Sequence, residues 1–359
     1  MARPLLLPLP ELRRWTTAHA LDYPKDFTRA MAAAFGVTRA AAAPAVRQLE
    51  LEGFIERSGG STRPVFTPGP SRFVNADFDL PGVDESAVWE KHFAPYLGLQ
   101  PALDNRVHYA LTVVVNNAND HAGGRHLTVR CAVAGGVLYL WIVDDGIGVF
   151  ERMSLTLGLQ DRRLAVLELS KGRVTTDPKN HTGEGIFFTS RAFSVFKIEA
   201  NGLVYERRNR ELDRGDATAA ACPPLALPPA PRLAGADAEA GTRVTMAVRL
   251  SSTLALRDIF NRYTTGAPDD LRFDRTVIPV RLARLGGENL LSRSQAKRVM
   301  SGVEKFKMVD LDFEGVPEIG QAFADEIFRV FAAAHPAVTV RAVHAGPGVL
   351  PMIRRVSAR

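Results

Sequence analysis

The sequence predicts a mixed α+β protein with more than one domain. Its 359 residues exceed the length of one typical domain and suit two or three. Hydrophobic residues make up 46% of the chain and charged residues 23%, a globular composition that argues against a largely disordered chain. Helical spacing of apolar residues near the N-terminus gives way to strand and helix patterns further along. We place the domains at 1–75, 76–252 and 253–359.

The charge and the cysteines restrict the class of protein. A formal charge of +6 permits a polyanionic partner without requiring one, because basic surfaces are often simply solvated. The chain has two cysteines, Cys131 and Cys222, which are not in a metal-ligand spacing. We therefore expect the protein to reside in the reducing environment of the cytosol. The leucine run at 5–7 is broken by prolines and is too short for a signal peptide or a spanning helix. We therefore expect a soluble, cytoplasmic protein.

The first segment, from Pro10 to about residue 70, predicts two helices followed by a hairpin. The first helix carries an apolar stripe and stops at Gly36. Thr38 can cap a second helix that runs to Gly53, and a hairpin with a polar tip at 58–62 follows. The apolar positions of the two helices are Phe27, Met31, Ala34, Phe35, Val46, Leu49 and Leu51.

The stretch GVTRAAAAPAVRQLELEGFIERSG, residues 36–59, resembles the recognition half of a bacterial winged helix-turn-helix. Such a domain inserts its second helix into the major groove. The groove-facing positions here are mainly alanines and Pro44, which offer no hydrogen bonds to bases. Residues 1–75 hold ten Lys and Arg against six Asp and Glu, a net charge of +4. A winged helix used for protein contact or dimerisation is the alternative. The expected phosphate contacts are Arg39, Arg47, Arg57 and Arg63.

The middle of the chain, residues 76–252, predicts helices and strands around a hairpin. The hairpin turns at Gly135-Gly136, and its apolar second strand delivers Asp144. The stretch 212–240 is rich in proline and alanine, which is typical of a mobile insertion within a hairpin. The predicted elements are a helix at 103–122, the hairpin at 127–143, and strands at 196–205 and 243–250.

Three short segments follow one another in a fixed order in this region. They are VVNNANDHA, VDDGIGV and TGEGIFFTSRAF, at residues 114–122, 143–149 and 182–193. Together, at this spacing, they resemble the nucleotide pocket of the GHKL ATPase and kinase superfamily. That superfamily includes gyrase-type topoisomerases, Hsp90 chaperones, MutL-type repair proteins, histidine kinases and anti-sigma-factor kinases. The resemblance implies a central α/β sandwich of the GHKL (Bergerat) type that binds ATP.

The resemblance also assigns roles to single residues. Asn117 would coordinate Mg²⁺ on the phosphates, in keeping with the preference of Mg²⁺ for oxygen ligands. The alternative is an asparagine that satisfies a helix end. Asp144 would accept the adenine amino group, while Gly146 and Gly148 let the backbone approach the base. A tight acidic turn is the alternative for this segment.

The third segment implies a phosphate site. Gly183 and Gly185 precede a helix, where freed backbone N–H groups form an anion site suited to phosphate. The resemblance makes residues 164–181 a lid, in which Lys171 either pairs with the phosphates or is simply solvated. Thr242 resembles the last nucleotide contact of the family.

The chain departs from the family pattern at two positions. A further glycine common among relatives is Phe187 here, and the glutamate that activates water, four residues before the metal asparagine, is Val113. Valine can neither accept a proton nor orient water, so we expect a rate loss of roughly a hundred- to ten-thousandfold. Asp120 and His121 lie three and four residues beyond Asn117, on the same face of an α-helix. They are candidates for a substitute base, although we favour a bracing role.

The C-terminal part predicts strands at 306–313 and 337–343 and a helix after Gly320, which suggests a small α/β layer fold. The stretch LDFEGVPEIGQAFADEIFRVF, residues 311–331, resembles a STAS-like domain found behind GHKL modules in bacterial proteins. In STAS anti-sigma antagonists a phosphorylatable serine follows the equivalent strand, whereas residues 320–322 read Gly-Gln-Ala here. We expect no serine-phosphorylation switch at this point.

The combined resemblance implies a bacterial regulator with ATP and Mg²⁺ as cofactors. Nucleotide binding would control DNA binding through the winged helix, or a protein partner through the STAS-like domain, and a homodimer is compatible with both. The alternative is an ATPase or protein kinase that acts on a partner in a partner-switching pathway. His92 and His108 lie in no dimerisation-helix pattern, which argues against a standard histidine kinase. A nucleic-acid-binding scaffold with a degenerate pocket is a third interpretation.

Overall fold

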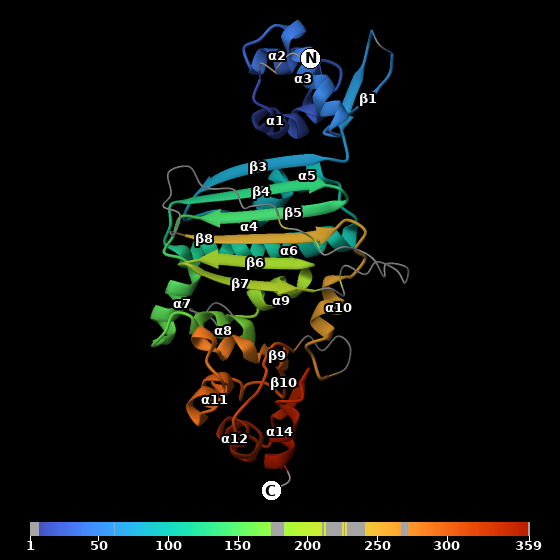
Figure 1. The fold of residues 1–359 in the computed structure, drawn as a ribbon. Coiled ribbons are helices and arrows are strands. Elements are labelled where there is room, and N and C mark those ends of the chain that lie inside the picture. The colour runs from blue at the N-terminus through green and yellow to red at the C-terminus, as the bar shows by residue number, and fades with distance from the viewer. Residues whose placement is uncertain are drawn as a thin grey trace. The chain divides into compact units, whose positions relative to one another are not determined.

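The computed structural model describes residues 7–60, 62–173, 183–209, 212, 225, 227, 241–266 and 272–357. Within these residues the chain is a mixed α+β protein whose strands form a two-stranded, a three-stranded and a six-stranded sheet (Figure 1). The chain divides into two compact units, which are 1–146 with 193–199 and 206–254, and 147–192 with 200–205 and 255–359. The domain boundaries expected after residues 75 and 252 remain predictions. The two compact units are divided at other residues than these.

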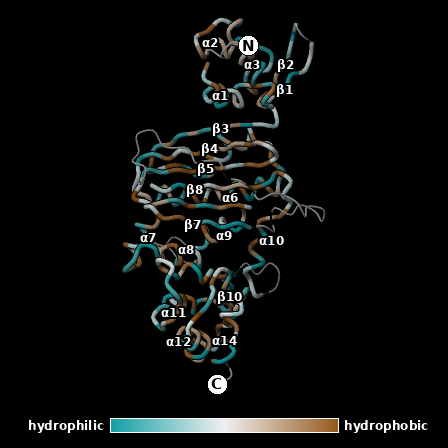
Figure 2. Tube along the Cα trace, in the orientation of Figure 1, coloured by the Kyte–Doolittle hydropathy of each residue, from teal (hydrophilic) through white to brown (hydrophobic). Residues whose placement is uncertain are grey.

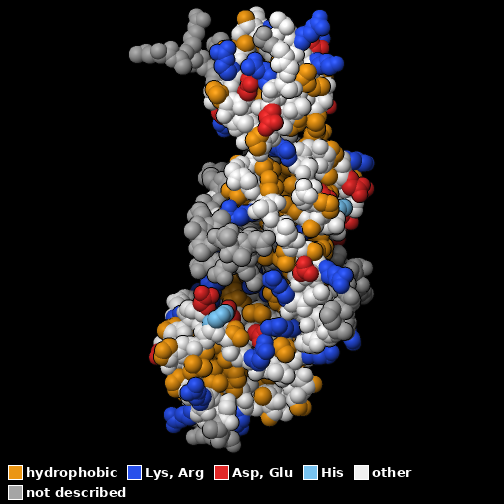
Figure 3. Space-filling view, turned by 90° about the vertical axis from the view of Figure 1, so that its right-hand side faces the viewer, with side chains coloured by type: hydrophobic (Ala, Val, Ile, Leu, Met, Phe, Trp, Pro, Cys, Tyr) orange, Lys and Arg blue, Asp and Glu red, His pale blue; other side chains and the backbone are white. Residues whose placement is uncertain are grey.

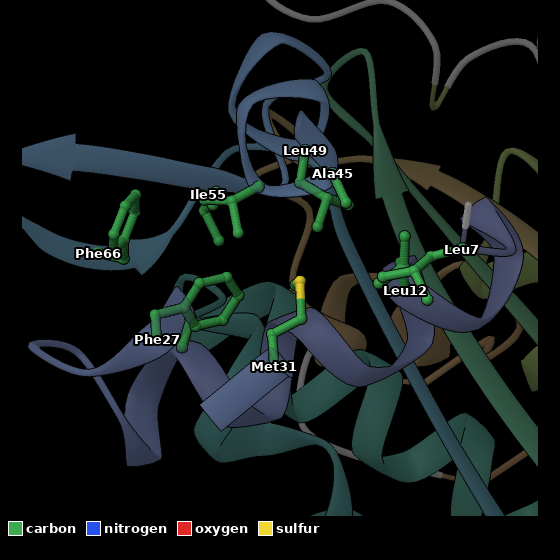
Figure 4. Close-up of a cluster of buried hydrophobic side chains, with 10 residues drawn as sticks. Leu7, Leu12, Phe27, Met31, Ala45, Leu49, Ile55 and Phe66 are labelled. Atoms are coloured by element: carbon green, nitrogen blue, oxygen red, sulfur yellow. The ribbon is translucent and has the colours of Figure 1, made fainter. Parts of the chain in front are cut away.

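The N-terminal part of the first unit has three helices and a hairpin around one hydrophobic core (Figure 4). Their bounds are α1 Leu9–Asp22, α2 Phe27–Ala34, α3 Arg39–Leu51, β1 Ile55–Ser58 and β2 Val65–Pro68. The buried side chains of this core include Leu12, Phe27, Met31, Ala45 and Leu49. Thr38 caps α3 as predicted, because its Oγ1 accepts the N–H of Ala41 at 3.2 Å. Ala34 and Leu51, expected on the apolar faces, are exposed instead.

Most residues of the six-stranded sheet, whose strand order is β3-β4-β5-β8-β6-β7, belong to the first unit. Its strands are β3 Arg72–Asp79, β4 His126–Ala134, β5 Val137–Asp144, β6 Val195–Ala200, β7 Leu203–Arg208 and β8 Thr242–Arg249. β4 and β5 pair antiparallel with Leu127 opposite Asp144, which confirms the predicted hairpin. Hydrophobic stretches run along the central strands (Figure 2), and Val129, Cys131 and Leu140 are fully buried.

Helices lie against one face of this sheet, which accounts for the burial of its strands (Figure 1). They are α4 Glu85–His92, α5 Ala94–Leu97 and α6 Pro101–Asn117. α6 contributes Val107 and Leu111, both fully buried, to the core. Val137 of β5 packs in a separate buried cluster with Leu225. Apart from residues 212, 225 and 227, the insertion expected at 212–240 lies outside the described residues, as does Cys222.

Two predicted elements of this region are corrected by the structure. The strand expected at 196–205 is a hairpin, because Asn201 and Gly202 adopt φ values of 53° and 72° and reverse the chain between β6 and β7. The helix expected at 103–122 is α-helical only to Asn117. A π-helical turn, η1 (Ala118–Ala122), continues it.

The second unit combines helices with a parallel three-stranded sheet in the order β11-β10-β9. The strands are β9 Arg275–Pro279, β10 Met308–Asp312 and β11 Thr339–Val343. The helices include α7 Val149–Leu157, α8 Leu164–Lys171, α9 Gly185–Ala192, α10 Leu256–Asn261, α11 Arg293–Met300, α12 Gln321–Asp325 and α14 Leu350–Ser357, with the π-helical turn η5 Glu326–Phe331 after α12. The strands predicted around residues 306–313 and 337–343 and the helix after Gly320 are therefore confirmed.

An ion-pair network crosses the strands of this smaller sheet. Asp310 of β10 is buried, and its two oxygens accept hydrogen bonds from Arg275 of β9 and from Arg341 of β11. Burial raises the pKa of the Asp310 carboxyl, but the two guanidinium groups outweigh it and hold that pKa below its usual range. The side chains therefore tie together all three strands of the sheet.

Across the part of the chain that the structure describes, we find no helix with the length and apolar character needed to cross a membrane.

Candidate functional site

Asp144 is the centre of the candidate site in the first unit. It is the last residue of β5 and is 6% exposed. Its Oδ1 accepts the backbone N–H of Gly146 at 2.9 Å and that of Thr242 at 3.2 Å. Burial raises the pKa of Asp144 to about 6, although the two backbone hydrogen bonds favour the ionised form. The structure therefore brings together three of the residues assigned to the nucleotide by resemblance.

Glycines around Asp144 are required by close backbone approach. A Cβ at Gly146 would collide with the carbonyl group of Ala122 at the end of η1. A Cβ at Gly241, whose φ is +83°, would collide with the carbonyl oxygen of Asp144. These contacts hold the turn after β5 against η1 and against the start of β8, and so they fix where the Asp144 carboxylate lies.

Asp145 fixes the same turn from its other side. Its Oδ1 accepts the N–H groups of Arg125 at 2.7 Å and His126 at 2.8 Å, and its Oδ2 lies 2.7 Å from His126 Nδ1. Burial raises the pKa of Asp145, but the hydrogen bonds from His126 and Arg125 outweigh it and hold that pKa below its usual range. The sequence contains a signal for the pairing of Asp145 with His126. The Gly135-Gly136 turn sets the antiparallel register of β4 and β5, and this register continues to place residue 126 opposite residue 145.

Asn117 ends α6, with a half-buried side chain that makes no hydrogen bond to another described residue. Its amide oxygen is therefore available as a hard ligand, the kind of donor that Mg²⁺ prefers. Val113, one α-helical turn earlier, is half-buried. Within the described residues no group of three or more His, Cys, Asp or Glu side chains is placed to hold a metal ion.

Asp120 and His121 lie in the π-helical turn η1 and not in the regular α-helix from which their placement on the face of Asn117 is predicted. Their role as a substitute base or a brace stays a prediction. The Asp120 side chain is exposed and accepts a hydrogen bond from Asn119 at 3.2 Å. Asn119, which sequence reasoning missed, also accepts the N–H of Gly82 at 2.7 Å and so anchors the turn.

In the second unit, the side chain of Asn201 explains why residue 148 is a glycine. Its φ is +87°, and a Cβ there would collide with the side chain of Asn201. Asn201 accepts the N–H of Glu151 at 3.1 Å and donates to the carbonyl of Ile147 at 2.8 Å. Asn201 thus fixes the start of α7. The sequence signal for it is the Asn-Gly pair, which marks a tight turn.

Lys171 has partners other than those expected of it. Its side chain is 2% exposed, and Nζ donates to Glu168 Oε1 at 2.7 Å. It also donates to the carbonyl oxygens of Arg298 at 2.9 Å and Ser301 at 3.0 Å. Burial lowers the pKa of Lys171, and Glu168 opposes that change. The expected alternatives were a phosphate partner and a solvated lysine, and the structure shows a buried anchor.

The glycine segment of the second unit is described from Gly183 onward. Gly183 has a φ of +72°, and Gly185 begins α9. Phe187, at the position where the resemblance expects a glycine, is buried, and its ring centroid lies 4.4 Å from that of Phe273. Of the expected lid, α8 and the residues to 173 are described, and the rest lies outside the described residues.

Basic side chains are distributed over the N-terminal part (Figure 3). Arg39 and Arg47 of α3 and Arg63 after β1 are exposed, as expected for phosphate contacts. Arg57 instead pairs with Glu50 at 3.2 Å, which reduces the charge that it offers to another anion. The exposed positions of α3 also include Ala40, Ala43, Pro44 and Leu51.

Comparison with known proteins identifies one part of the chain. A family model described as a STAS-like domain of unknown function (DUF4325) matches residues 295–347. That stretch contains β10, α12, η5 and β11. No curated protein matches the chain. The protein therefore carries a STAS-like domain in its C-terminal part.

Proposed function

We propose that the protein is an ATP-binding regulator with a winged helix, a central GHKL-type fold and a STAS-like domain. Nucleotide binding controls the binding of DNA through α3, of a protein partner through the STAS-like domain, or of both. Hydrolysis is slow or absent because Val113 occupies the position of the catalytic glutamate.

The observation that carries this proposal is the buried carboxylate of Asp144. Burying a carboxylate costs free energy unless hydrogen bonds compensate, so a buried acid at the end of a central strand marks a functional position. The backbone N–H groups of Gly146 and Thr242 hold it in one orientation. A carboxylate fixed in this way can accept the amino group of adenine. Asn117 supplies an oxygen for Mg²⁺, which would neutralise phosphate charge.

The N-terminal part supports the DNA component of the proposal. Three helices followed by the β1–β2 hairpin are the elements of a winged helix, in the order that the resemblance implies. Arg39 and Arg47 lie on the exposed side of α3, where cations can neutralise phosphates. The alanines between them leave few hydrogen bonds for reading bases, so we expect weak sequence preference.

The decisive test is equilibrium ATP binding by Asp144→Ala. Loss of a charged hydrogen-bond acceptor should weaken binding by roughly a hundredfold. Asp79→Ala is the matched control, because it removes an exposed carboxylate at the end of β3, an edge strand of the same sheet. This control should keep ATP affinity within about threefold. Undiminished ATP affinity in Asp144→Ala would contradict the site.

A further inference from the structure

Residues 171–173 join α8 to the STAS-like domain within the second unit. The ammonium group of Lys171 meets the carbonyls of Arg298 and Ser301, at the C-terminal end of α11, where a helix carries partial negative charge. The carbonyl of Lys171 accepts the hydroxyl of Thr276 of β9 at 2.6 Å. Lys171 and Thr276 are both buried, so this end of α8 is firmly held.

Arg173 extends the connection to the segment before β10. Its Nη1 donates to the carbonyl of Lys305 at 2.9 Å, and Lys305 Nζ donates in return to the carbonyl of Arg173. The guanidinium lies over the rings of Phe273 and Phe306, 5.5 and 5.3 Å from their centroids. The φ of Arg173 is 53°, in the left-handed region, which is unfavourable for a residue with a side chain.

Arg173 also reaches the glycine segment proposed to bind phosphate. Its Nε lies 3.5 Å from Oε1 of Glu184, the residue between Gly183 and Gly185. The pair lacks hydrogen-bond geometry, and among the described residues the buried Nε finds no hydrogen-bond partner. Burial raises the pKa of Glu184, and Arg173 opposes that change. One guanidinium is thus shared between the glycine segment and the STAS-like domain.

We propose that Arg173 couples phosphate binding at Gly183 and Gly185 to the order of residues 301–306 in the STAS-like domain. This inference rests on the proposed function. A bound phosphate brings negative charge beside Glu184 and competes for Arg173. The guanidinium then leaves the Lys305 carbonyl, and the segment before β10 loosens.

Three physical features favour this competition. Arginine forms stronger, often bidentate hydrogen bonds with phosphate than with a single carbonyl oxygen. Its present pair with Glu184 is long, and among the described residues its Nε finds no hydrogen-bond partner, so this donor can turn to a phosphate oxygen. Release also relieves a left-handed backbone conformation that the Lys305 contacts now maintain. Lys171 is saturated with hydrogen bonds, so it keeps α8 in place while Arg173 moves.

The test uses the full chain and two measurements. Calorimetry gives the affinity for ATP with Mg²⁺, and hydrogen–deuterium exchange follows residues 301–306 with and without saturating ATP. We expect ATP to speed exchange in that segment of the wild-type protein. Arg173→Gln should exchange fast without ATP, show no further change with it, and bind ATP roughly threefold to tenfold more weakly.

Glu184→Gln and Arg163→Gln complete the test. Glu184→Gln removes the competitor, so it should bind ATP about threefold more tightly and keep the ATP-dependent exchange. Arg163 lies at the other end of α8, just before its first residue, and pairs with the nearby Asp161, so Arg163→Gln should match the wild type. Opposite shifts in affinity for Arg173→Gln and Glu184→Gln distinguish competition from a general loss of stability.

The outcomes separate this inference from the proposed function. ATP binding to wild-type protein without any change at 301–306 would overturn the coupling and leave the proposed function intact. Shifts of the affinity in the same direction for Arg173→Gln and Glu184→Gln would also overturn the coupling alone. No ATP binding by the wild-type protein would overturn both.

Discussion

At the scale of single residues, the burial of Asp144 makes the charge of the candidate site depend on pH. Its carboxylate is held at the end of β5 by two backbone donors, yet burial still raises its pKa to about 6. The protein therefore holds a group that changes charge close to neutral pH. Only the ionised form offers all of its oxygens as acceptors for the amino group of adenine.

This shift predicts a pH dependence of binding with a definite sign. As pH rises through about 6, Asp144 ionises and adenosine binding should strengthen, with roughly tenfold weaker binding at pH 5 than at pH 8. Adenosine is the probe because it carries no titrating phosphate. Titrations at several pH values would measure the effect, and Asp144→Asn should flatten it. A wild-type affinity independent of pH over this range would argue against contact between Asp144 and the base.

The same residue affects stability with the opposite trend. The folded pKa lies above the ordinary aspartate value of 3.8, so the folded state binds more protons than the unfolded state between about pH 4 and 6. The contribution of Asp144 to the free energy of unfolding therefore falls as pH rises through that window. Asp144→Asn should remove this slope in urea unfolding curves.

The hydrogen-bond partners of Lys171 could not be predicted from the sequence. Lys171 lies in the segment 164–181, which the GHKL resemblance makes a lid, and α8 lies in that segment. Nothing in the sequence pattern indicates that its Nζ meets carbonyl oxygens 127 and 130 residues further along the chain. Such contacts depend on tertiary packing. The position of Asp144, in contrast, could be predicted because it directly follows an apolar strand.

At the scale of elements, prediction succeeded where a local signal fixes the geometry. The Gly135-Gly136 turn sets the register of β4 and β5, and Thr38 caps α3. The Asn201-Gly202 turn carried the same kind of signal, and it was overlooked because apolar residues continue on both sides. The π-helical turn η1 had no signal, because its hydrogen bonding depends on contacts such as those of Asn119.

The α-helical part of α6 makes the role of Val113 testable. Val113 and Asn117 are one turn apart in a regular helix, so a glutamate at 113 would lie beside the proposed metal ligand. We expect Val113→Glu to raise ATP hydrolysis by roughly tenfold to a hundredfold through general-base catalysis. Release of γ-labelled phosphate measures the rate. Val113→Gln is the matched control, since it has similar size and polarity but accepts no proton.

The results of this assay divide the candidate functions. Equal rates in Val113→Glu and Val113→Gln would contradict the placement of Val113 beside the phosphates. Fast hydrolysis or self-labelling by the wild-type protein would instead favour an ATPase or kinase. In that case Asp120→Ala and His121→Ala should be examined for loss of the label.

At the scale of the whole molecule, the patterns of helices and strands predicted the mixed α+β class, and the resemblance of residues 311–331 predicted the C-terminal STAS-like domain. They did not predict β9, a short strand that ends in Pro279 and pairs in parallel with a strand much later in the chain. Parallel partners leave no turn signal between them, and proline weakens a strand pattern. The sequence also did not predict that residues 147–192 group with the C-terminal part, because this grouping depends on contacts between residues far apart in the chain.

If nucleotide controls DNA binding, the two affinities must be linked reciprocally. ATP with Mg²⁺ should change the affinity for a mixed-sequence duplex by roughly fivefold or more, and the duplex should change ATP affinity by the same factor. Fluorescence anisotropy at fixed salt measures the first factor and calorimetry the second. Arg39→Gln with Arg47→Gln should weaken DNA binding and lower its salt slope by about two, while ATP binding stays unchanged.

Asp144→Ala provides the complementary control, because it should keep DNA affinity and lose the response to ATP. A ligand shifts a conformational equilibrium only by its differential affinity for the two states, so a true regulator must show both factors. DNA affinity that is identical with and without ATP, in protein that binds both, would exclude control of DNA by nucleotide. The STAS-like domain would then be the element through which bound ATP acts.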